Sequence, residues 1–199
     1  MHFATLSKAV QACRFLIESG CKVDVSDNDG FTPLHYASRD NNIEIISLLI
    51  DSHSDINAKN FDGLTPFHLS SLMCAKDAMV ILLDRGANIH AKGNDGQTPV
   101  HLAATGCDKT VLSLLLERGA NIEEKDNDDK TPLHFAARAN SREGVEFILS
   151  QGGGVDVNIA DDDGLTPLHW ASRANAADAG TVLISSGADV NRADKVSSI

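Results

Sequence analysis

The sequence has few aromatic residues and little positive charge. The first shortage limits which residues can build the core, and the second argues against two classes of binding partner. Phe, Trp and Tyr number 7, 1 and 1 among 199 residues, so a core must be built mostly from Leu, Ile, Val and Ala. The net charge is −11, and neither half of the chain is basic. Nucleic acids and anionic membrane surfaces are bound by clustered Lys and Arg. We therefore expect neither of them as a partner.

Long apolar runs and closely spaced cysteines are also missing. No apolar run approaches the ~20 residues that span a bilayer, and the N-terminus lacks the apolar segment of a signal peptide. The four cysteines have no Cys-x-x-Cys spacing, which argues against a disulfide framework. We expect reduced thiols in a cytoplasmic, intracellular protein without direct membrane insertion.

The chain contains only 5 prolines, and all of them belong to one repeated motif. The tetrapeptide Thr-Pro-apolar-His recurs at intervals of 33, 33, 33 and 35 residues, as Thr32-Pro33-Leu34-His35, Thr65-Pro66-Phe67-His68, Thr98-Pro99-Val100-His101, Thr131-Pro132-Leu133-His134 and Thr166-Pro167-Leu168-His169. Thr is a good helix N-cap, and Pro suits the first helical turn. A short helix therefore begins at each Pro.

A second, more apolar helix follows each short one, and a turn completes the unit. Gly86, Gly119 and Gly187 end second helices in the left-handed conformation that Gly adopts easily. The Asn/Asp-Gly pairs at 29–30, 62–63, 95–96 and 163–164 predict hairpin turns between units. Asp129 replaces the turn glycine in one unit, and His53 replaces a helix-ending glycine in another.

The period, the motif and the closing Gly-Ala-Asn element resemble ankyrin repeats over nearly the whole chain. The resemblance implies an all-α repeat solenoid of stacked helix-turn-helix units, right-angled and L-shaped, joined by β-hairpin loops. It also implies that each motif His bridges its own Thr and the adjacent unit. The first helices would line a concave palm, and the hairpins would project as fingers.

The period divides the chain into repeats of one continuous solenoid domain. These are a partial N-terminal repeat at 1–26, repeats at 27–59, 60–92 and 93–125, a repeat with a two-residue Gly insertion at 126–160, a repeat at 161–193, and a tail or start of a further repeat at 194–199. The first four residues align with residues 133–136, so the given sequence begins inside a first helix. We expect either irregular caps or a fragment of a longer array, and a looser loop at Gly152-Gly153-Gly154.

No catalytic or metal-binding constellation accompanies the repeats. Zinc ligands lie about 2.0–2.2 Å from one ion, whereas equivalent positions in packed units lie roughly 8–10 Å apart. The five motif histidines therefore form a ladder and not a cluster. The acidic strings near Asp126 and Asp161 do not fit a calcium loop, and no nucleotide or nucleophile motif is present. We expect no enzyme, no metal and no cofactor.

Exposed positions that differ between repeats are the candidate protein-binding residues. The apolar candidates are Phe31, Phe61, Leu64, Leu72 and Met73, because a contiguous apolar patch usually marks an interaction site. The charged candidates are Arg39, the ladder of Arg138 and Arg173, and the acidic residues Asp128, Asp129, Asp162 and Asp163. The alternatives are that the apolar side chains pack into neighbouring loops, and that the arginines only pair with nearby carboxylates. Trp170 is expected in the core beside the palm.

These observations favour a non-catalytic protein–protein interaction module. It would bind a basic or mixed-charge protein partner through its palm and fingers, as a monomeric scaffold or adaptor. The alternative is an architectural spacer, either a fragment of a longer ankyrin array or part of a multidomain scaffold or effector protein.

Overall fold

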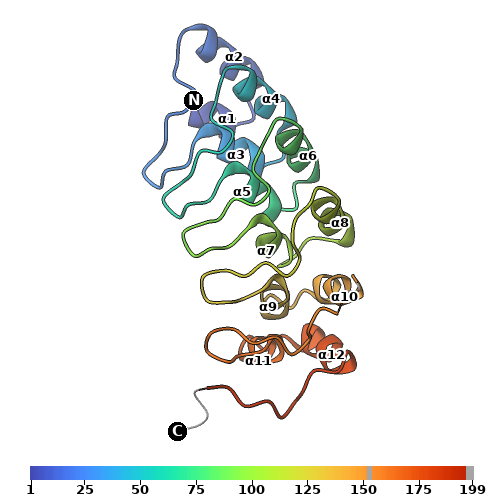
Figure 1. The fold of residues 1–199 in the computed structure, drawn as a ribbon. Helices are drawn as coiled ribbons and strands as arrows, with labels where there is room; N and C mark the ends of the chain where they lie inside the picture. Colours follow the sequence, from blue (N-terminus) through green and yellow to red (C-terminus); the bar gives the residue numbers. More distant parts are fainter. Residues whose placement is uncertain (152–153, 196–199) are drawn as a thin grey trace. The chain divides into compact units, whose positions relative to one another are not determined.

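The computed structural model describes residues 1–151 and 154–195, and the chain divides into two compact units, Met1–Asn94 and Asp95–Ile199. Both units consist of paired helices joined by loops (Figure 1). Unit 1 contains α1 (His2–Leu6), α2 (Val10–Glu18), α3 (Pro33–Arg39), α4 (Ile43–Asp51), α5 (Pro66–Leu72) and α6 (Lys76–Asp84). Unit 2 contains α7 (Pro99–Ala103), α8 (Lys109–Glu117), α9 (Pro132–Arg138), α10 (Arg142–Ser150), α11 (Pro167–Arg173) and α12 (Ala177–Ser185).

The first helix of each complete repeat begins at the motif Pro, as predicted. The preceding Thr is extended, and its side chain and the motif His form a capping box. The box satisfies amide groups that would otherwise have no partner in the first turn. The prediction for the second helices is also confirmed, because Gly86, Gly119 and Gly187 follow them with φ of 95, 94 and 94°. His53 takes the same conformation, with φ of 68°.

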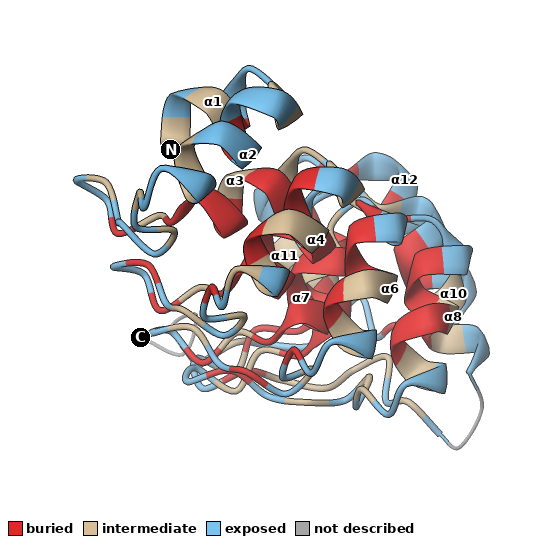
Figure 2. Cartoon of the chain, turned by 90° about the horizontal axis from the view of Figure 1, so that it is seen from above, coloured by how far each residue is buried: buried red, intermediate tan, exposed pale blue. Residues whose placement is uncertain are grey.

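In unit 1, first helices pack on first helices and second helices on second helices. Helix α3 contacts α1 and α5, and α4 contacts α2 and α6. The packing buries Leu34, Ile45, Ile46, Leu49 and Phe67 completely, and each such side chain contributes about 1.5–3 kcal/mol. Helices α1 and α2 bury only Thr5 and Cys13, so they carry far fewer buried residues than α3 and α4 (Figure 2).

Unit 2 follows the same plan with smaller residues at its helix contacts. Helix α9 contacts α7 and α11, while α10 contacts α8 and α12. Ala104, Ala136 and Ala137 are fully buried beside Leu133 and Ile148. A Cβ on Gly144 would lie 2.6 Å from the carbonyl oxygen of Ala104, so α10 approaches this backbone at a distance that only glycine permits.

The loops between repeats, called finger loops here, contain no strand within the described residues. The predicted hairpins are tight turns, in which the N–H of Asp27 donates to the carbonyl oxygen of Phe31 at 3.0 Å, for example. Most of the loop expected to be looser, Gly152-Gly153-Gly154, and most of the tail or further repeat expected at 194–199 lie outside the described residues.

The cysteine expectation holds for two of the four residues. Cys13 and Cys21 are free thiols, and Cys13 packs in the core as a small apolar side chain. Cys74 and Cys107 are disulfide-bonded, so the expectation of reduced thiols is wrong for them. Spacing along the sequence carried no signal for this, because disulfide formation depends on geometry that the fold decides.

Candidate protein-binding surface

Each motif His contacts its own Thr. His35, His101 and His134 also bond to the next repeat of the same unit, an arrangement called the histidine tie here. In unit 1 the N–H of Thr32 donates to Nδ1 of His35 at 3.0 Å. Nε2 of His35 lies 3.0 Å from the carbonyl oxygen of Leu64. Because Nδ1 accepts a hydrogen bond, the ring hydrogen is on Nε2, which donates to that carbonyl.

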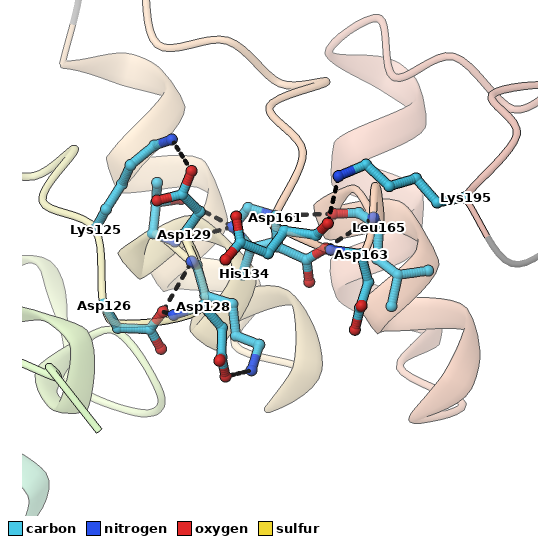
Figure 3. A network of polar contacts seen from close by, with 12 residues as sticks. Lys125, Asp126, Asp128, Asp129, His134, Asp161, Asp163, Leu165 and Lys195 are labelled. Carbon is cyan, nitrogen blue, oxygen red and sulfur yellow. Dashed lines mark hydrogen bonds and ion pairs between the residues drawn. The ribbon is translucent and has the colours of Figure 1, made fainter. Parts of the chain in front are cut away.

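The same tie recurs in unit 2. Nε2 of His101 donates to the carbonyl of Lys130 at 3.1 Å, and Nε2 of His134 donates to the carbonyl of Leu165 at 3.2 Å (Figure 3). Burial lowers the pKa of His35, His101 and His134, and it outweighs the backbone hydrogen bonds that raise it. These imidazoles are therefore neutral at pH 7 and form a buried frame under the exposed residues.

Adjacent finger loops are joined by backbone hydrogen bonds. In unit 1 the N–H of Phe61 donates to the carbonyl of Asp29 at 3.1 Å, and that of Asn94 donates to the carbonyl of Asp62 at 2.8 Å. A Cβ on Gly30, whose φ is 84°, would lie 2.8 Å from the backbone nitrogen of Phe61. Conformation and space both require glycine at this turn, so the loops are held in register.

The acidic candidates of unit 2 lie on two neighbouring finger loops (Figure 3). Asp128 pairs with Lys130 and Asp129 pairs with Lys125, each at 2.7 Å. Asp129 adopts a φ of 61° where other repeats have glycine, as Asp tolerates better than most residues. The exposed carboxylates on the next loop belong to Asp162 and Asp163.

Two of the apolar candidates, Phe31 and Leu64, are only half-exposed. The Phe31 ring packs against His35 and Tyr36, with centroid separations of 5.6 Å in both cases. The backbone of Leu64 receives the hydrogen bond from His35. Phe31 therefore belongs in part to the packing of its own repeat, and Leu64 takes part in the bond between two repeats.

The other apolar candidates are exposed but separated. Phe61 is 70% exposed on a finger loop, while Leu72 and Met73 are 37% and 53% exposed at the C-terminal end of α5. Helix α5 has seven residues, which places its ends about 10 Å apart. The expected apolar patch is thus divided into Phe61 and a Leu72–Met73 pair.

Arg39 belongs to a cluster around the single tyrosine, called the tyrosine site: Asp27, Tyr36, Arg39 and Asp40. The Tyr36 hydroxyl donates to Oδ2 of Asp27, and this hydrogen bond raises the pKa of Tyr36 to about 12. Burial raises the pKa of Asp27, but its hydrogen bonds outweigh burial and lower the pKa overall. The Arg39 guanidinium lies 5.0 Å from the Tyr36 ring centroid, and its Nε is 2.7 Å from Asp40.

Arg138 and Arg173 belong to a second cluster, called the tryptophan site: Lys130, Arg138, Asp161, Trp170 and Arg173. Trp170 is half-buried, and its Nε1 donates to Oδ2 of Asp161 at 2.8 Å. The ring centroid lies 5.1 Å from the Lys130 ammonium, 5.9 Å from the Arg138 guanidinium and 5.3 Å from that of Arg173. The two arginines of the expected ladder therefore share one aromatic ring.

Tyr36 and Lys130 were not among the candidates selected from the sequence, and Trp170 was expected in the core. A positional signal was available. Aromatic residues occupy the fourth position after the motif Thr in three repeats, at Tyr36, Phe135 and Trp170. Their significance depends on side chains from neighbouring segments, which the repeat pattern does not specify.

Within residues 1–151 and 154–195, no three His, Cys, Asp or Glu side chains are grouped so that they could hold a metal ion. The helices in that part of the chain are also too short or too polar to cross a membrane. The surface of the described residues therefore consists of exposed side chains that are supported by the buried motif histidines.

Comparison with known proteins agrees with the repeat architecture. No curated protein matches the sequence. A family model described as ankyrin repeats, in three copies, matches residues 1–93, 67–161 and 123–194. These matches cover most of the chain and include all five Thr-Pro-apolar-His motifs. With these matches and with paired helices along its described residues, the chain belongs to the ankyrin repeat family.

Proposed function

We propose that the chain is a non-catalytic protein–protein interaction module that holds a mixed-charge partner against its finger loops and the ends of its first helices. Ankyrin repeats are generally protein–protein interaction modules, and the family is typically non-catalytic. Fold alone does not decide function, so the proposal rests on the exposed residues.

The end of each first helix varies in sequence while the capping motif beneath it is constant. The seventh and eighth residues after the motif Thr are Arg39-Asp40, Leu72-Met73, Thr105-Gly106, Arg138-Ala139 and Arg173-Ala174. All of these residues are exposed or half-exposed. Constant residues maintain the fold, and varied exposed residues are suited to recognition.

The observation that carries the proposal is the exposed Leu72–Met73 pair. Two adjacent large apolar side chains in water gain free energy when a partner covers them, at about 25 cal/mol per Å² of apolar surface. Met also adapts its shape to different partners. The acidic finger loops would steer positively charged parts of a partner toward the surface.

Affinity capture with the wild type and with Leu72→Asp/Met73→Asp tests this function. We expect the double variant to lose proteins that the wild type retains. The matched control is Gln11→Asp/Ala12→Asp, which adds the same charge at exposed positions on α2 and should capture the wild-type set. Equal capture by all three proteins would remove the Leu72–Met73 pair as the site.

Capture of no protein by the wild type would contradict the interaction function and favour the architectural spacer. We further propose that the module acts as a cytoplasmic monomer. Size-exclusion chromatography of the purified chain tests its oligomeric state, and cell fractionation tests its location.

A further inference from the structure

We propose that the tryptophan site binds carboxylate side chains of an acidic segment in a protein partner. The inference rests on the proposed interaction function and specifies the chemistry that one part of the surface recognises. It concerns residues of unit 2 alone, and so it is independent of the Leu72–Met73 pair.

The first argument is the concentration of positive charge on one ring. The chain has a net charge of −11, yet Lys130, Arg138 and Arg173 lie between 5.1 and 5.9 Å from the centroid of Trp170. Each cation is attracted to the ring face, but like charges so close together repel one another. An anion placed among them would relieve that repulsion.

The second argument is that the two carboxylates in contact with the side chains of this site, those of Asp161 and Asp128, are already engaged. Asp161 is buried, and its oxygens accept hydrogen bonds from Trp170, Asp163 and Leu165 at 2.8, 3.1 and 2.8 Å. Lys130 is paired with Asp128 at 2.7 Å. Arg138 and Arg173 are exposed, and neither forms an ion pair in the part of the chain that the structure describes. Two guanidinium groups are therefore available to an external acceptor.

The third argument comes from the equivalent position in unit 1. There Arg39 also lies over an aromatic ring, but the next residue is Asp40, whose carboxylate binds it at 2.7 Å. In unit 2 the residues that follow the arginines are Ala139 and Ala174. The tryptophan site thus lacks, twice, the internal carboxylate that neutralises the tyrosine site.

The geometry suits carboxylates for a further reason. A guanidinium group can donate two parallel hydrogen bonds to one carboxylate, and stacking on an aromatic ring holds its plane in place before binding. Trp and Arg are also the residues most enriched in binding hot spots. The exposed Asp162 and Asp163 nearby disfavour a continuous polyanion and favour a peptide that carries a few acidic side chains.

The chain's single tryptophan allows a direct test, because its fluorescence reports on Trp170 alone. The purified full chain is titrated with an octaglutamate peptide and, separately, with octaglutamine. We expect a saturable change in emission with octaglutamate and none with octaglutamine. The change should diminish as salt is added, because the interaction is between charges.

The decisive variant is Ala139→Asp/Ala174→Asp, which supplies both arginines with the carboxylate that Arg39 already has. We expect it to weaken octaglutamate binding at least about tenfold. Ala12→Asp/Ala177→Asp is the matched control, because it adds the same charge at exposed positions on α2 and α12, and it should bind nearly as the wild type does. Circular dichroism confirms that both variants are folded.

Three results would overturn the inference: no binding of octaglutamate, equal binding of octaglutamine, or undiminished binding by Ala139→Asp/Ala174→Asp. An oligothymidylate of eight nucleotides that bound more tightly than octaglutamate would also overturn it, in favour of single-stranded nucleic acid. Because the titration uses a defined peptide and unit 2 variants, its failure would leave the capture result for Leu72 and Met73 standing.

Discussion

The tyrosine site of unit 1 and the tryptophan site of unit 2 occupy equivalent positions, and each is anchored by an Asp at the start of its finger loop. Tyr36 donates to Asp27, and Trp170 donates to Asp161. The arginines differ in their surroundings, because Arg39 has Asp40 while Arg138 and Arg173 have alanines next to them. The same buried scaffold can therefore present a self-neutralised surface or an open cationic one, according to the charged residues around the ring.

The largest expected effect tests whether the buried histidines contribute equally to the stability of the two units. His35→Ala and His134→Ala each leave a cavity, an unpaired Thr N–H and an unpaired carbonyl, and each should cost about 3 kcal/mol of unfolding free energy. Urea denaturation measures the loss, with the exposed His90→Ala as control. A much smaller loss for either variant would mean that the frames of the two units are not equivalent.

Acid should weaken the frame in both units. Burial lowers the pKa of His35, His101 and His134, whereas in the unfolded chain these groups take up protons near pH 6.5. The unfolded state therefore binds more protons as the pH falls below that value, and the free energy of unfolding decreases. Urea midpoints at pH 7.5 and 5.5 measure this. His35→Ala and His134→Ala should each reduce the pH dependence, and an unchanged dependence would contradict this account.

The two aromatic anchors should differ in energetic importance. Trp170→Phe leaves Oδ2 of the buried Asp161 without its donor, and should cost about 1–3 kcal/mol of unfolding free energy. Tyr36→Phe should cost about 1 kcal/mol or less, because water can reach the half-exposed Asp27 and replace the hydroxyl. Chemical denaturation of the two variants measures the difference. A larger loss for Tyr36→Phe would reverse the comparison.

The smallest expected effect is confined to the tyrosine site. The hydrogen bond to Asp27 raises the pKa of Tyr36 to about 12, so the stability that it contributes is present below about pH 10 and is lost as the pH rises through the folded-state pKa. Asp27→Asn should lower this pKa, as followed by the ultraviolet absorbance of the chain's only phenolate. Identical titration curves for wild type and variant would show that Asp27 is not the cause.

The sequence was sufficient to predict the helix starts, because they depend on local chemistry. A Thr N-cap followed by Pro determines the first turn within four residues, and Gly86 ends α6 for a similarly local reason. The hairpin loops were predicted in place, but none of their described residues forms a strand. These loops are held in place by backbone N–H groups that donate to aspartate side chains and by hydrogen bonds between adjacent loops.

The candidate site was less predictable, because it depends on side chains from separate segments. The Arg138–Arg173 ladder followed from the period alone. The position of these cations around the Trp170 ring did not follow from the period, because Lys130 comes from a finger loop and Arg138 from the preceding repeat. Likewise, the contacts of Phe31 with Tyr36 and His35 could not be inferred from hydrophobicity.

The histidine ties also bear on how such a chain can change its length. Each tie has its donor in one repeat and its acceptor in the next, 29 residues on for His35 and His101. Removing or duplicating one whole period anywhere within a unit therefore reconnects every donor to an equivalent acceptor. Recombination between the repeated segments of the gene would thus produce proteins that still fold and that carry new combinations of exposed residues at the helix ends.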